Sequence, residues 1–445
     1  MKLHDLLDKY NRVFPDRMGE QFAKQTTGPD SGEPRFFYAP GRVNLIGEHI
    51  DYSGGYVFPC ALTLGTYAAI CLRDDNTVRL VSGNIEPPVT VSLEDLSYNP
   101  AHGWANNPKG VTKLLADMGH KLCGYDMYVW GNLPNSAGLS SSASLAVLTA
   151  LALDTMFGLG IPPVERALLC QRVENEYLGV SCGIMDQFAS TMGRKNHAIL
   201  LNCSNLEYEY VPLELGDYQL VLANTNSPRG LADTKYNERR VECDLALEIL
   251  QRACDAKNLC DIEPDKFAEY ARAAFGDAVV NKGLRVITEA LLDPESKGTS
   301  EPTAEENAFK RAYHAATENE RVKYAVKVLN QGDLAAFGEA MTGSHVSLRD
   351  FYEVTGDALD ALVLAAWELE ETVLSPGDCV PLPKTKVLGS RMTGAGFGGC
   401  TVSVVHKDSV EDFIREVGKR YTQLTGLTAD FYVAETDDGA REIFV

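Results

Sequence analysis

The segment with the clearest chemical potential is rich in Ser and Gly and runs from residue 134 to residue 144. It reads Pro-Asn-Ser-Ala-Gly-Leu-Ser-Ser-Ser-Ala-Ser and separates a strand-like run, Tyr125 to Trp130, from an apolar helical run, Leu145 to Phe157. The start of a helix leaves backbone N–H groups without intrahelical partners, and the helix dipole adds positive potential there. The small residues allow close approach, and Ser hydroxyls can contact phosphate oxygens or a magnesium ion. We predict a phosphate-binding loop, with a simple Ser/Gly helix cap as the alternative.

A second polar segment, Gly41 to Tyr52, lies between apolar residues. It contains four residues that can form ions or hydrogen bonds: Arg42, Glu48, His49 and Asp51. Buried polar groups need partners, and a ligand with many hydroxyl groups offers donors and acceptors in matching density. Taken alone, an internal network of Arg42 with Glu48 or Asp51 is the more common explanation, so both interpretations stay open.

Asp186 is an acidic residue in an apolar setting, at the start of a predicted helical turn in Ser-Cys-Gly-Ile-Met-Asp-Gln-Phe, residues 181 to 188. Asp in a first turn is most often a cap or a partner of the helix dipole. A carboxylate near an arginine can also accept the proton of an attacking hydroxyl, or hold that hydroxyl in line for phosphoryl transfer. We expect Asp186 to be the catalytic carboxylate.

A third glycine-rich run contains Gly394, Gly396 and Gly399 in the spacing G-x-G-x-x-G. A dinucleotide-binding fingerprint needs a helix after these glycines, whereas here the alternating run Cys400 to Val405 follows. We expect a glycine-rich turn that brings one domain against the nucleotide loop of the other. The sequence has no G-x-x-x-x-G-K-[ST] run and no H-R-D loop, which excludes the P-loop and protein-kinase routes to phosphoryl transfer.

Around these segments the pattern predicts an α+β protein. Helical spacing is found in residues 4–25, 104–121, 145–157, 163–177, 234–256, 304–330, 333–348 and 356–373. Strand-like runs are found between 35 and 82 and at 197–201, 218–223, 387–392, 400–406 and 429–434. We expect two domains, residues 1–210 and 211–445, because 445 residues exceed the usual size of a single core.

The composition narrows the class of protein. A net charge of −21 argues against nucleic acid or an anionic membrane as a partner, since both require clustered Lys and Arg. The 11 cysteines include no C-x-x-C pair, and the N-terminus has no apolar leader segment, so we expect free thiols in the cytoplasm. The longest apolar stretch, Val57 to Leu72, is interrupted by polar residues and is too short to span a membrane.

Three motifs together resemble the galactokinase family of the GHMP kinases. The first resembles the galactokinase signature, Ala-Pro-Gly-Arg-Val-Asn-Leu-Ile-Gly-Glu-His-Ile-Asp-Tyr at residues 39–52. The Ser-rich segment resembles the ATP loop, and Gly-Ser-Arg-Met-Thr-Gly-Ala-Gly-Phe-Gly-Gly-Cys at 389–400 resembles the glycine-rich third motif. The resemblance implies an N-terminal domain of mixed sheet with helices, similar to ribosomal protein S5, and a C-terminal domain of antiparallel sheet with helices. The active site is expected in the cleft between them.

The resemblance also implies residue roles. The catalytic residues are expected to be Asp186, as the base, and Arg42, beside the transferred phosphoryl group. Sugar contacts are expected from Glu48, His49, Asp51, Gly183 and Tyr236. ATP contacts are expected from Trp104, Asn106, Ser136, Gly138, Ser140, Ser141 and Ser142. Magnesium is expected at Ser142 and Glu174. The reaction implied is transfer of a phosphoryl group from ATP to the anomeric hydroxyl of galactose by a monomer.

Two alternatives remain open. Ile50 stands where bacterial galactokinases usually have Thr. Ile is familiar at this point in eukaryotic galactokinases and in N-acetylgalactosamine kinases, so N-acetylgalactosamine is the first alternative substrate. The second is a non-catalytic regulator that senses galactose and ATP. Such relatives lack two residues of the Ser-Ala run, which is complete here at residues 140–144.

Overall fold

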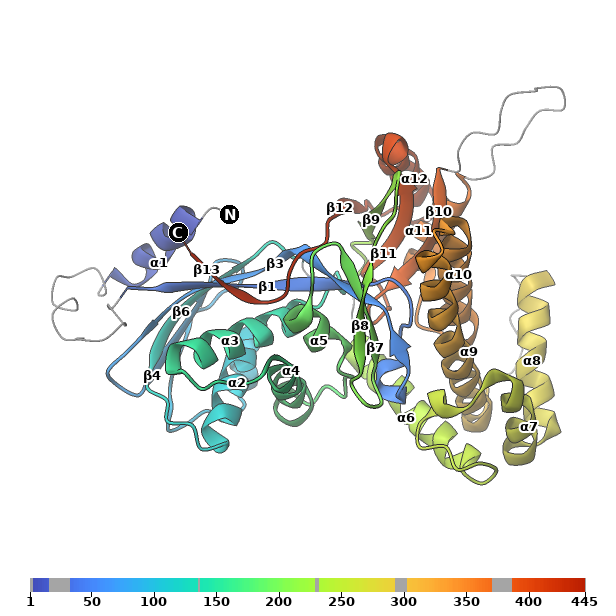
Figure 1. The fold of residues 1–445 in the computed structure, drawn as a ribbon, viewed down its shortest axis with the longest axis horizontal. Coiled ribbons are helices and arrows are strands. Elements are labelled where there is room, and N and C mark those ends of the chain that lie inside the picture. The colour runs from blue at the N-terminus through green and yellow to red at the C-terminus, as the bar shows by residue number, and fades with distance from the viewer. Residues whose placement is uncertain are drawn as a thin grey trace.

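Three β-sheets organise the chain and divide it into an N-terminal and a C-terminal half (Figure 1). The computed structural model describes residues 3–15, 33–134, 137–228, 232–292, 302–369 and 386–444. The sheets have the strand orders β13-β1-β3-β6-β4-β5, β10-β11-β9-β12 and β2-β7-β8. The strands are β1 (Arg35–Asn44), β2 (Tyr56–Val57), β3 (Pro59–Leu72), β4 (Thr77–Ser82), β5 (Val89–Ser92), β6 (Tyr125–Gly131), β7 (His197–Asn202), β8 (Tyr208–Pro212), β9 (Tyr218–Asn224), β10 (Val387–Thr393), β11 (Cys400–His406), β12 (Asp430–Ala434) and β13 (Arg441–Ile443).

Helices cover the sheets and form most of the C-terminal half (Figure 1). They are α1 (Leu3–Val13), α2 (Asn106–Asp117), α3 (Ser141–Phe157), α4 (Pro163–Arg172), α5 (Met185–Met192), α6 (Ala232–Leu250), α7 (Pro264–Phe275), α8 (Asp277–Leu292), α9 (Ala304–Asn330), α10 (Leu334–Ser347), α11 (Asp357–Trp367) and α12 (Val410–Thr425). In the described ranges, none of these helices has the length and apolar character that a membrane span requires.

The six-stranded sheet is buried on both faces, which side-chain alternation along its strands explains. Phe36 of β1 belongs to a core cluster with Leu6 and Tyr10 of α1. Its neighbour Phe37 belongs to the opposite cluster, which includes residues of α2 and α3. Because successive side chains in a strand point to opposite faces, one strand serves both cores. The strands pair antiparallel except β4 with β6, which are parallel, so the mixed sheet expected for the N-terminal half is confirmed.

The four-stranded sheet of the C-terminal half follows the same rule. Val404 of β11 lies in the core that α9 and α10 share, and Val405 lies in the cluster formed with α11 and α12. All pairings in this sheet are antiparallel, as expected. The glycine-rich third motif connects β10 to β11, and it leads into a strand as the sequence predicts.

Several sequence predictions differ from the structure in extent. The helix predicted for 4–25 ends at Val13, and residues 16–25 lie outside the described residues. Helices α7 and α8 occupy a stretch with no predicted helix, although Pro264 in the first turn of α7 is a helix-start signal. The division predicted between residues 210 and 211 falls within β8 and stays a prediction; β13 returns to pair with β1 of the N-terminal sheet.

Helix α9 joins the halves through polar contacts to the segment that follows β1. The carboxylate of Glu318 accepts a hydrogen bond from the Gly47 N–H at 3.0 Å, and the Asn319 side chain accepts one from the Tyr56 N–H at 2.8 Å. Residues 318 and 319 are adjacent on the helix and serve two ends of the same loop. The C-terminal half therefore fixes the loop that carries the polar residues of the first motif.

Helix α10 packs on β10 through two facing glycines, and this contact generates a stability prediction. A Cβ atom added at Gly338 would lie 2.0 Å from the Leu388 carbonyl oxygen, whereas one added at Gly343 of the same helix meets nothing closer than 3.4 Å. We expect Gly338→Ala to lower the free energy of unfolding by about 1–3 kcal/mol through overpacking. The matched control Gly343→Ala should be neutral or stabilising, because Ala is the better helix former. Chemical denaturation of both variants checks this, and equal stabilities would contradict it.

Candidate active site

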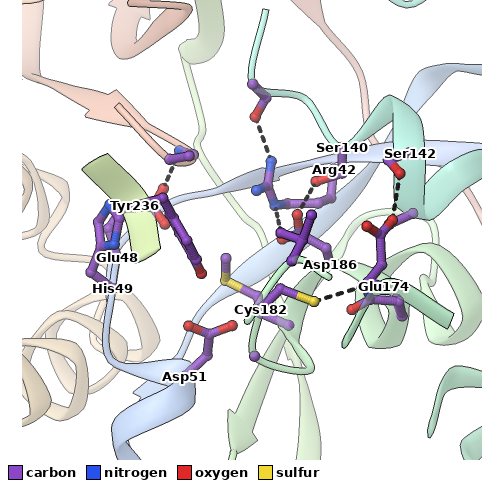
Figure 2. A pocket seen from close by; sticks show the side chains of 18 of the residues that line it. Arg42, Glu48, His49, Asp51, Ser140, Ser142, Glu174, Cys182, Asp186 and Tyr236 are labelled. Carbon is purple, nitrogen blue, oxygen red and sulfur yellow. Dashed lines mark hydrogen bonds and ion pairs between the residues drawn. The ribbon is translucent and has the colours of Figure 1, made fainter. Parts of the chain in front are cut away.

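A cavity of about 390 Å³ lies where the two halves meet (Figure 2). Segments far apart in the sequence line it: the end of β1 and the loop after it, the loop before α3, the starts of α5 and α6, and the turn after β10. All the described residues that were predicted to serve phosphate, sugar or magnesium line this cavity. They are Arg42, Glu48, His49, Asp51, Gly138, Ser140, Ser141, Ser142, Glu174, Gly183, Asp186 and Tyr236. Ser136 lies outside the described residues.

Arg42 and Asp186 form the central ion pair. The Arg42 Nε donates to Asp186 Oδ1 at 2.7 Å, and its Nη1 donates to the Gly138 carbonyl at 2.7 Å. The Ser140 hydroxyl donates to the other carboxylate oxygen of Asp186 at 2.6 Å. The Arg42 side chain is only 4% exposed while that of Asp186 is 32% exposed, so the arginine is fixed and the carboxylate remains accessible.

The Ser-rich loop begins helix α3 as predicted. Ser140 is the N-cap residue, with a left-handed φ of 62°, and its side chain makes no capping hydrogen bond because it reaches Asp186 instead. The first intrahelical hydrogen bond runs from the N–H of Ser144 to the Ser140 carbonyl. The N–H groups of residues 141–143 therefore have no acceptor within the helix. Ser141 is exposed at this point. The geometry fits an anion at the helix start better than a simple cap.

Ser142 and Glu174 meet across the cavity. The Ser142 hydroxyl donates to Glu174 Oε1, although the residues come from α3 and from the π-helical turn Val173–Leu178. Asn107 of α2 completes the group, since its amide donates to the Ser142 carbonyl at 3.1 Å and to the Ser142 hydroxyl at 3.0 Å. Sequence reasoning missed Asn107, and its position beside Asn106 in the Asn-Asn-Pro helix start was the available signal.

The opposite side of the cavity holds residues of the first motif. His49 has a left-handed φ of 61°, and its Nδ1 shares a hydrogen bond of 2.8 Å with the Tyr52 hydroxyl. The rings of His49 and Tyr236 lie 5.5 Å apart. A Cβ atom at Gly183 would lie 2.1 Å from Asp51 Oδ2, so only glycine fits beside this carboxylate. These groups form a wall of polar and aromatic side chains (Figure 2).

Glu48 differs from its neighbours because the chain itself satisfies it. Its carboxylate accepts hydrogen bonds from the Asn44 amide at 3.0 Å, the Thr393 hydroxyl at 3.0 Å and the Gly394 N–H at 2.6 Å, and it is 3.6 Å from Arg391. The internal network left open by the sequence therefore exists for Glu48. Apart from Asn44, its partners lie in the third motif, and neither Arg42 nor Asp51 is among them.

Burial and neighbouring charge set the ionisation of the cavity. Burial and the carboxylates of Asp186 and Glu48 raise the pKa of Asp51 to about 7. Burial and the nearby His314 lower the pKa of His49 to about 3, so its ring is neutral at physiological pH. Burial opposes the charge of Arg42, but Asp186 and Glu48 outweigh it and raise the Arg42 pKa.

A second cavity of about 290 Å³ adjoins the first, and Ser141 and Ser142 line both. Trp104 lines this second cavity, as does Asn107, and the buried Trp104 Nε1 has no hydrogen-bond partner in the described chain. Asn106 does not line either cavity. It is 2% exposed, and its amide donates to the Asn99 carbonyl at 2.7 Å, which fixes the loop that carries Trp104.

The glycine-rich turn meets the Ser-rich loop directly. Gly394 has a φ of 85°, and a Cβ atom there would lie 2.5 Å from the Gly138 carbonyl oxygen. The predicted approach of the second half to the Ser-rich loop is thus confirmed. Ile50, the residue that departs from the usual bacterial motif, is fully buried in the core and does not line the cavity, so its identity reflects packing.

Comparison with known proteins gives matches along the whole chain. Family models match at three places: "GHMP kinases N terminal domain" at residues 106–194, "Galactokinase galactose-binding signature" at 20–72, and "GHMP kinases C terminal" at 325–423. The chain is 47% identical to a galactokinase of Fusobacterium nucleatum, over 93% of this chain and 96% of that protein. It is 46% identical to a galactokinase of Lactiplantibacillus plantarum over the same shares.

Solved structures agree with these relatives. The crystal structure of Lactococcus lactis galactokinase complexed with galactose superposes with a TM-score of 0.82 at 37% identity, covering 99% of this chain and 100% of that one. The mevalonate kinase of Methanococcus jannaschii has the same fold, with a TM-score of 0.56 at 17% identity over 92% and 99% of the two chains. The identities of 37% to 47% with galactokinases, over nearly the full length, mean that the chain belongs to the galactokinase family of the GHMP kinases.

Proposed function

We propose that this protein transfers the γ-phosphoryl group of ATP to the C1 hydroxyl of galactose, giving galactose 1-phosphate and ADP. One observation carries the assignment of the site: the ion pair of Arg42 with Asp186 lies in the cavity lined by the sugar motif and touches the Ser-rich loop that borders the second cavity. The family supplies ATP as the second substrate. A sugar hydroxyl at Asp186 and a nucleotide reaching across Ser141 would meet at this pair.

Asp186 is proposed to hold the attacking hydroxyl and to receive its proton. A carboxylate in this position aligns the hydroxyl with the phosphorus atom, and a loose transition state needs little further assistance from a base. Arg42 is anchored by the Gly138 carbonyl, so its charge is fixed before the phosphoryl group arrives. A fixed cation stabilises charge that develops on the phosphoryl oxygens without reorganisation.

Ser142 and Glu174 are proposed to hold the magnesium ion of the nucleotide. They are hard oxygen donors already in contact at the helix start, and two such protein ligands suit Mg²⁺, which keeps waters and phosphate oxygens as its other ligands. When bound, Mg²⁺ neutralises phosphate charge. The described residues contain no cluster of three or more His, Cys, Asp and Glu side chains for a metal, which agrees with a site that the nucleotide completes.

His49, Asp51 and Tyr236 are proposed to bind the sugar, with Gly183 leaving space for its approach. Glu48 is proposed to support this wall, because its carboxylate already holds the Gly394 N–H. On the nucleotide side, Trp104 and the loop that Asn106 fixes are proposed to bind the base. The backbone of Gly138 and the hydroxyls of Ser140 and Ser141 are proposed to bind phosphates, and the role of Ser136 stays a prediction.

A sugar panel tests the function. Purified protein with ATP and Mg²⁺ should phosphorylate galactose at the anomeric position, with N-acetylgalactosamine, arabinose and galacturonate as competitors for the same site. We expect the highest kcat/KM for galactose, and chelation of Mg²⁺ should abolish turnover. A higher kcat/KM for N-acetylgalactosamine would reassign the substrate, and turnover of none of these sugars would reject the enzyme.

Replacing Asp186 tests its assigned role. Asp186→Ala should lower kcat by about 10²–10⁴-fold, the range for loss of a general base. The dissociation constant for galactose, measured by calorimetry, should change only a few-fold, since the other sugar contacts remain. Lost galactose affinity with intact turnover would instead make Asp186 a binding residue.

The ionised carboxylate of Asp51 should lower the free energy of unfolding while it contributes to galactose binding. Because its pKa is raised to about 7 in the folded protein, folding favours the protonated carboxyl, and the free energy of unfolding should fall as pH rises from about 4 to 7. Asp51→Asn removes this cost. We expect it to stabilise the protein at pH 8 by about 1–3 kcal/mol, less than the full shift because the cavity is open to water, and to lower galactose affinity.

Denaturation of Asp51→Asn and of the unaltered protein between pH 4 and pH 8 checks this expectation. The stability difference should be small at pH 4 and should grow toward pH 8. A difference that does not depend on pH would show that Asp51 is not buried as an unfavourable charge.

A further inference from the structure

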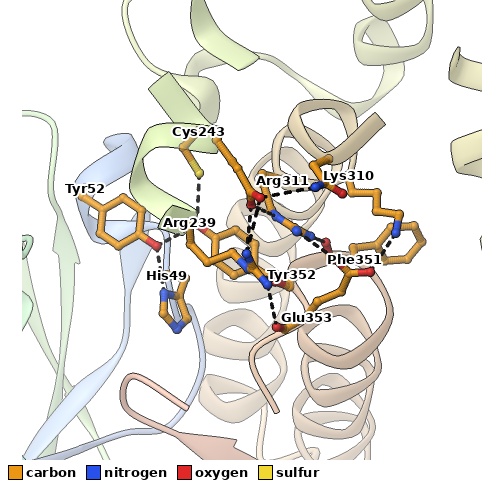
Figure 3. A network of polar contacts seen from close by, with 11 residues as sticks. His49, Tyr52, Arg239, Cys243, Lys310, Arg311, Phe351, Tyr352 and Glu353 are labelled. Carbon is orange, nitrogen blue, oxygen red and sulfur yellow. Dashed lines mark hydrogen bonds and ion pairs between the residues drawn. The ribbon is translucent and has the colours of Figure 1, made fainter. Parts of the chain in front are cut away.

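A chain of hydrogen bonds leads from the cavity into the core of the C-terminal half (Figure 3). His49 Nδ1 lies 2.8 Å from the Tyr52 hydroxyl, which lies 2.7 Å from the Tyr352 hydroxyl, which lies 3.0 Å from the Cys243 sulfur. Only His49 of the four lines the cavity. The other three therefore have no direct contact with a ligand there, and their effect has to pass through His49.

The inner members of the relay are buried and stacked, whereas Tyr52 is half-buried. Tyr352 is fully buried and Cys243 is 3% exposed. The Tyr352 ring lies 4.9 Å from the His49 ring on one side and 4.6 Å from the His314 ring on another. Removal of a single hydroxyl from this stack would leave the ring packing in place.

The turn that carries Tyr352 is fixed by two arginines. Arg239 donates to the carbonyls of Tyr352 at 2.9 Å and Glu353 at 3.1 Å, and Arg311 donates to the Phe351 carbonyl (Figure 3). These three successive carbonyls lie at the C-terminal end of the π-helical turn Leu348–Tyr352. Cations that donate hydrogen bonds to them also interact favourably with the helix dipole. Glu353 has a left-handed φ of 57°, so the helix stops here.

The buried charge of Arg311 is itself neutralised by two carboxylates. Its Nε donates to Glu242 at 2.6 Å and its Nη2 donates to Glu353 at 2.7 Å. Lys310 donates to the second oxygen of Glu353 at 2.7 Å. A buried charge that loses a partner costs several kcal/mol, so this network locks the position of the turn.

The direction of the relay follows from the donor strengths of its groups. His49 is neutral, because its pKa is lowered to about 3, so one ring nitrogen is a donor and the other an acceptor. A thiol is a weak acceptor, whereas an imidazole nitrogen is a good acceptor for a phenol. The favoured order runs from Cys243 through Tyr352 and Tyr52 to His49 Nδ1, which leaves the proton on Nε2. Nε2 is buried beside the backbone of Ala395, a cavity residue, and has no well-formed hydrogen bond there.

We propose that Tyr52 and Tyr352 are positioning residues that set the tautomer of His49, so that its buried Nε2–H is directed at the backbone of Ala395 and the ring is held in the cavity wall that faces the sugar. This inference rests on the proposed function of the cavity. Sugar affinity should depend on the relay, while the nucleotide side and the Arg42–Asp186 pair should not.

Conservative variants test the relay. Tyr52→Phe and Tyr352→Phe should each raise the galactose dissociation constant by about five-fold, the size of one neutral hydrogen bond, with kcat and the KM for ATP within two-fold. The matched control is Tyr313→Phe. Tyr313 packs 4.6 Å from the Phe351 ring in the same aromatic cluster but lies outside the relay, so this variant should bind galactose normally.

The double variant separates a relay from two independent contacts. If Tyr52 and Tyr352 act in series, the double variant Tyr52→Phe/Tyr352→Phe should bind galactose as well as the single variant that binds it less tightly. Its galactose dissociation constant should be raised about five-fold in all. Multiplied losses, equal losses for ATP, or no loss in either single variant would overturn the proposal. Thermal melting of each variant checks that it is folded.

A second readout does not require turnover. ¹⁵N spectra of histidine-labelled protein, assigned with His49→Gln, should show His49 protonated on Nε2, and Tyr52→Phe should weaken that preference. Protonation of Nδ1 in the unaltered protein would overturn the relay even if galactose is a good substrate. If the unaltered protein does not phosphorylate galactose but His49 shows the expected tautomer, the proposed function fails and the relay stands.

Discussion

The carboxylate of Glu48 is the point on which the two halves depend. It is 1% exposed, it comes from the loop after β1, and it accepts hydrogen bonds from Thr393 and Gly394 while facing Arg391 at 3.6 Å. Removing one partner of a buried ion pair costs about 3–5 kcal/mol, because the other charge is left unpaired. Separating the halves would therefore leave buried charges unpaired, which favours the arrangement in which residues of both halves line one cavity.

Glycines, which have no side chain, matter as much as charges for the close contacts around the cavity. Gly394 allows the turn after β10 to touch the Gly138 carbonyl, and Gly183 allows Asp51 to approach the backbone before Asp186. Catalysis of phosphoryl transfer relies on positioning and charge stabilisation, for which displacements of about 1 Å are costly. Glycine at these contacts therefore serves the precision of the site as well as the geometry of the turns.

The sequence indicated which residues gather at the site better than it indicated the hydrogen bonds between them. The Ser-rich loop, the strand after Gly399 and the helix 304–330 were predictable from local pattern, because caps, alternation and helical spacing are local signals. The family motif supplied which residues gather at the cavity. Neither could show that Asn107 holds Ser142 while Asn106 supports the loop before α2, since adjacent residues of one type differ only in the direction that the helix gives them.

The sequence also could not show which polar residues of the first motif are structural and which are free to bind a ligand. Burial alone does not distinguish these two roles. Glu48 is saturated by hydrogen bonds and is structural in that sense. Asp51 is held by the backbone N–H groups of Tyr52 and Met185, yet burial and two neighbouring carboxylates keep its pKa near 7. Asp186 keeps a third of its side chain accessible between Arg42 and Ser140. Unfavourable charge and retained access are tolerated where a ligand relieves them, so they mark the proposed sugar side of the cavity more clearly than residue type does.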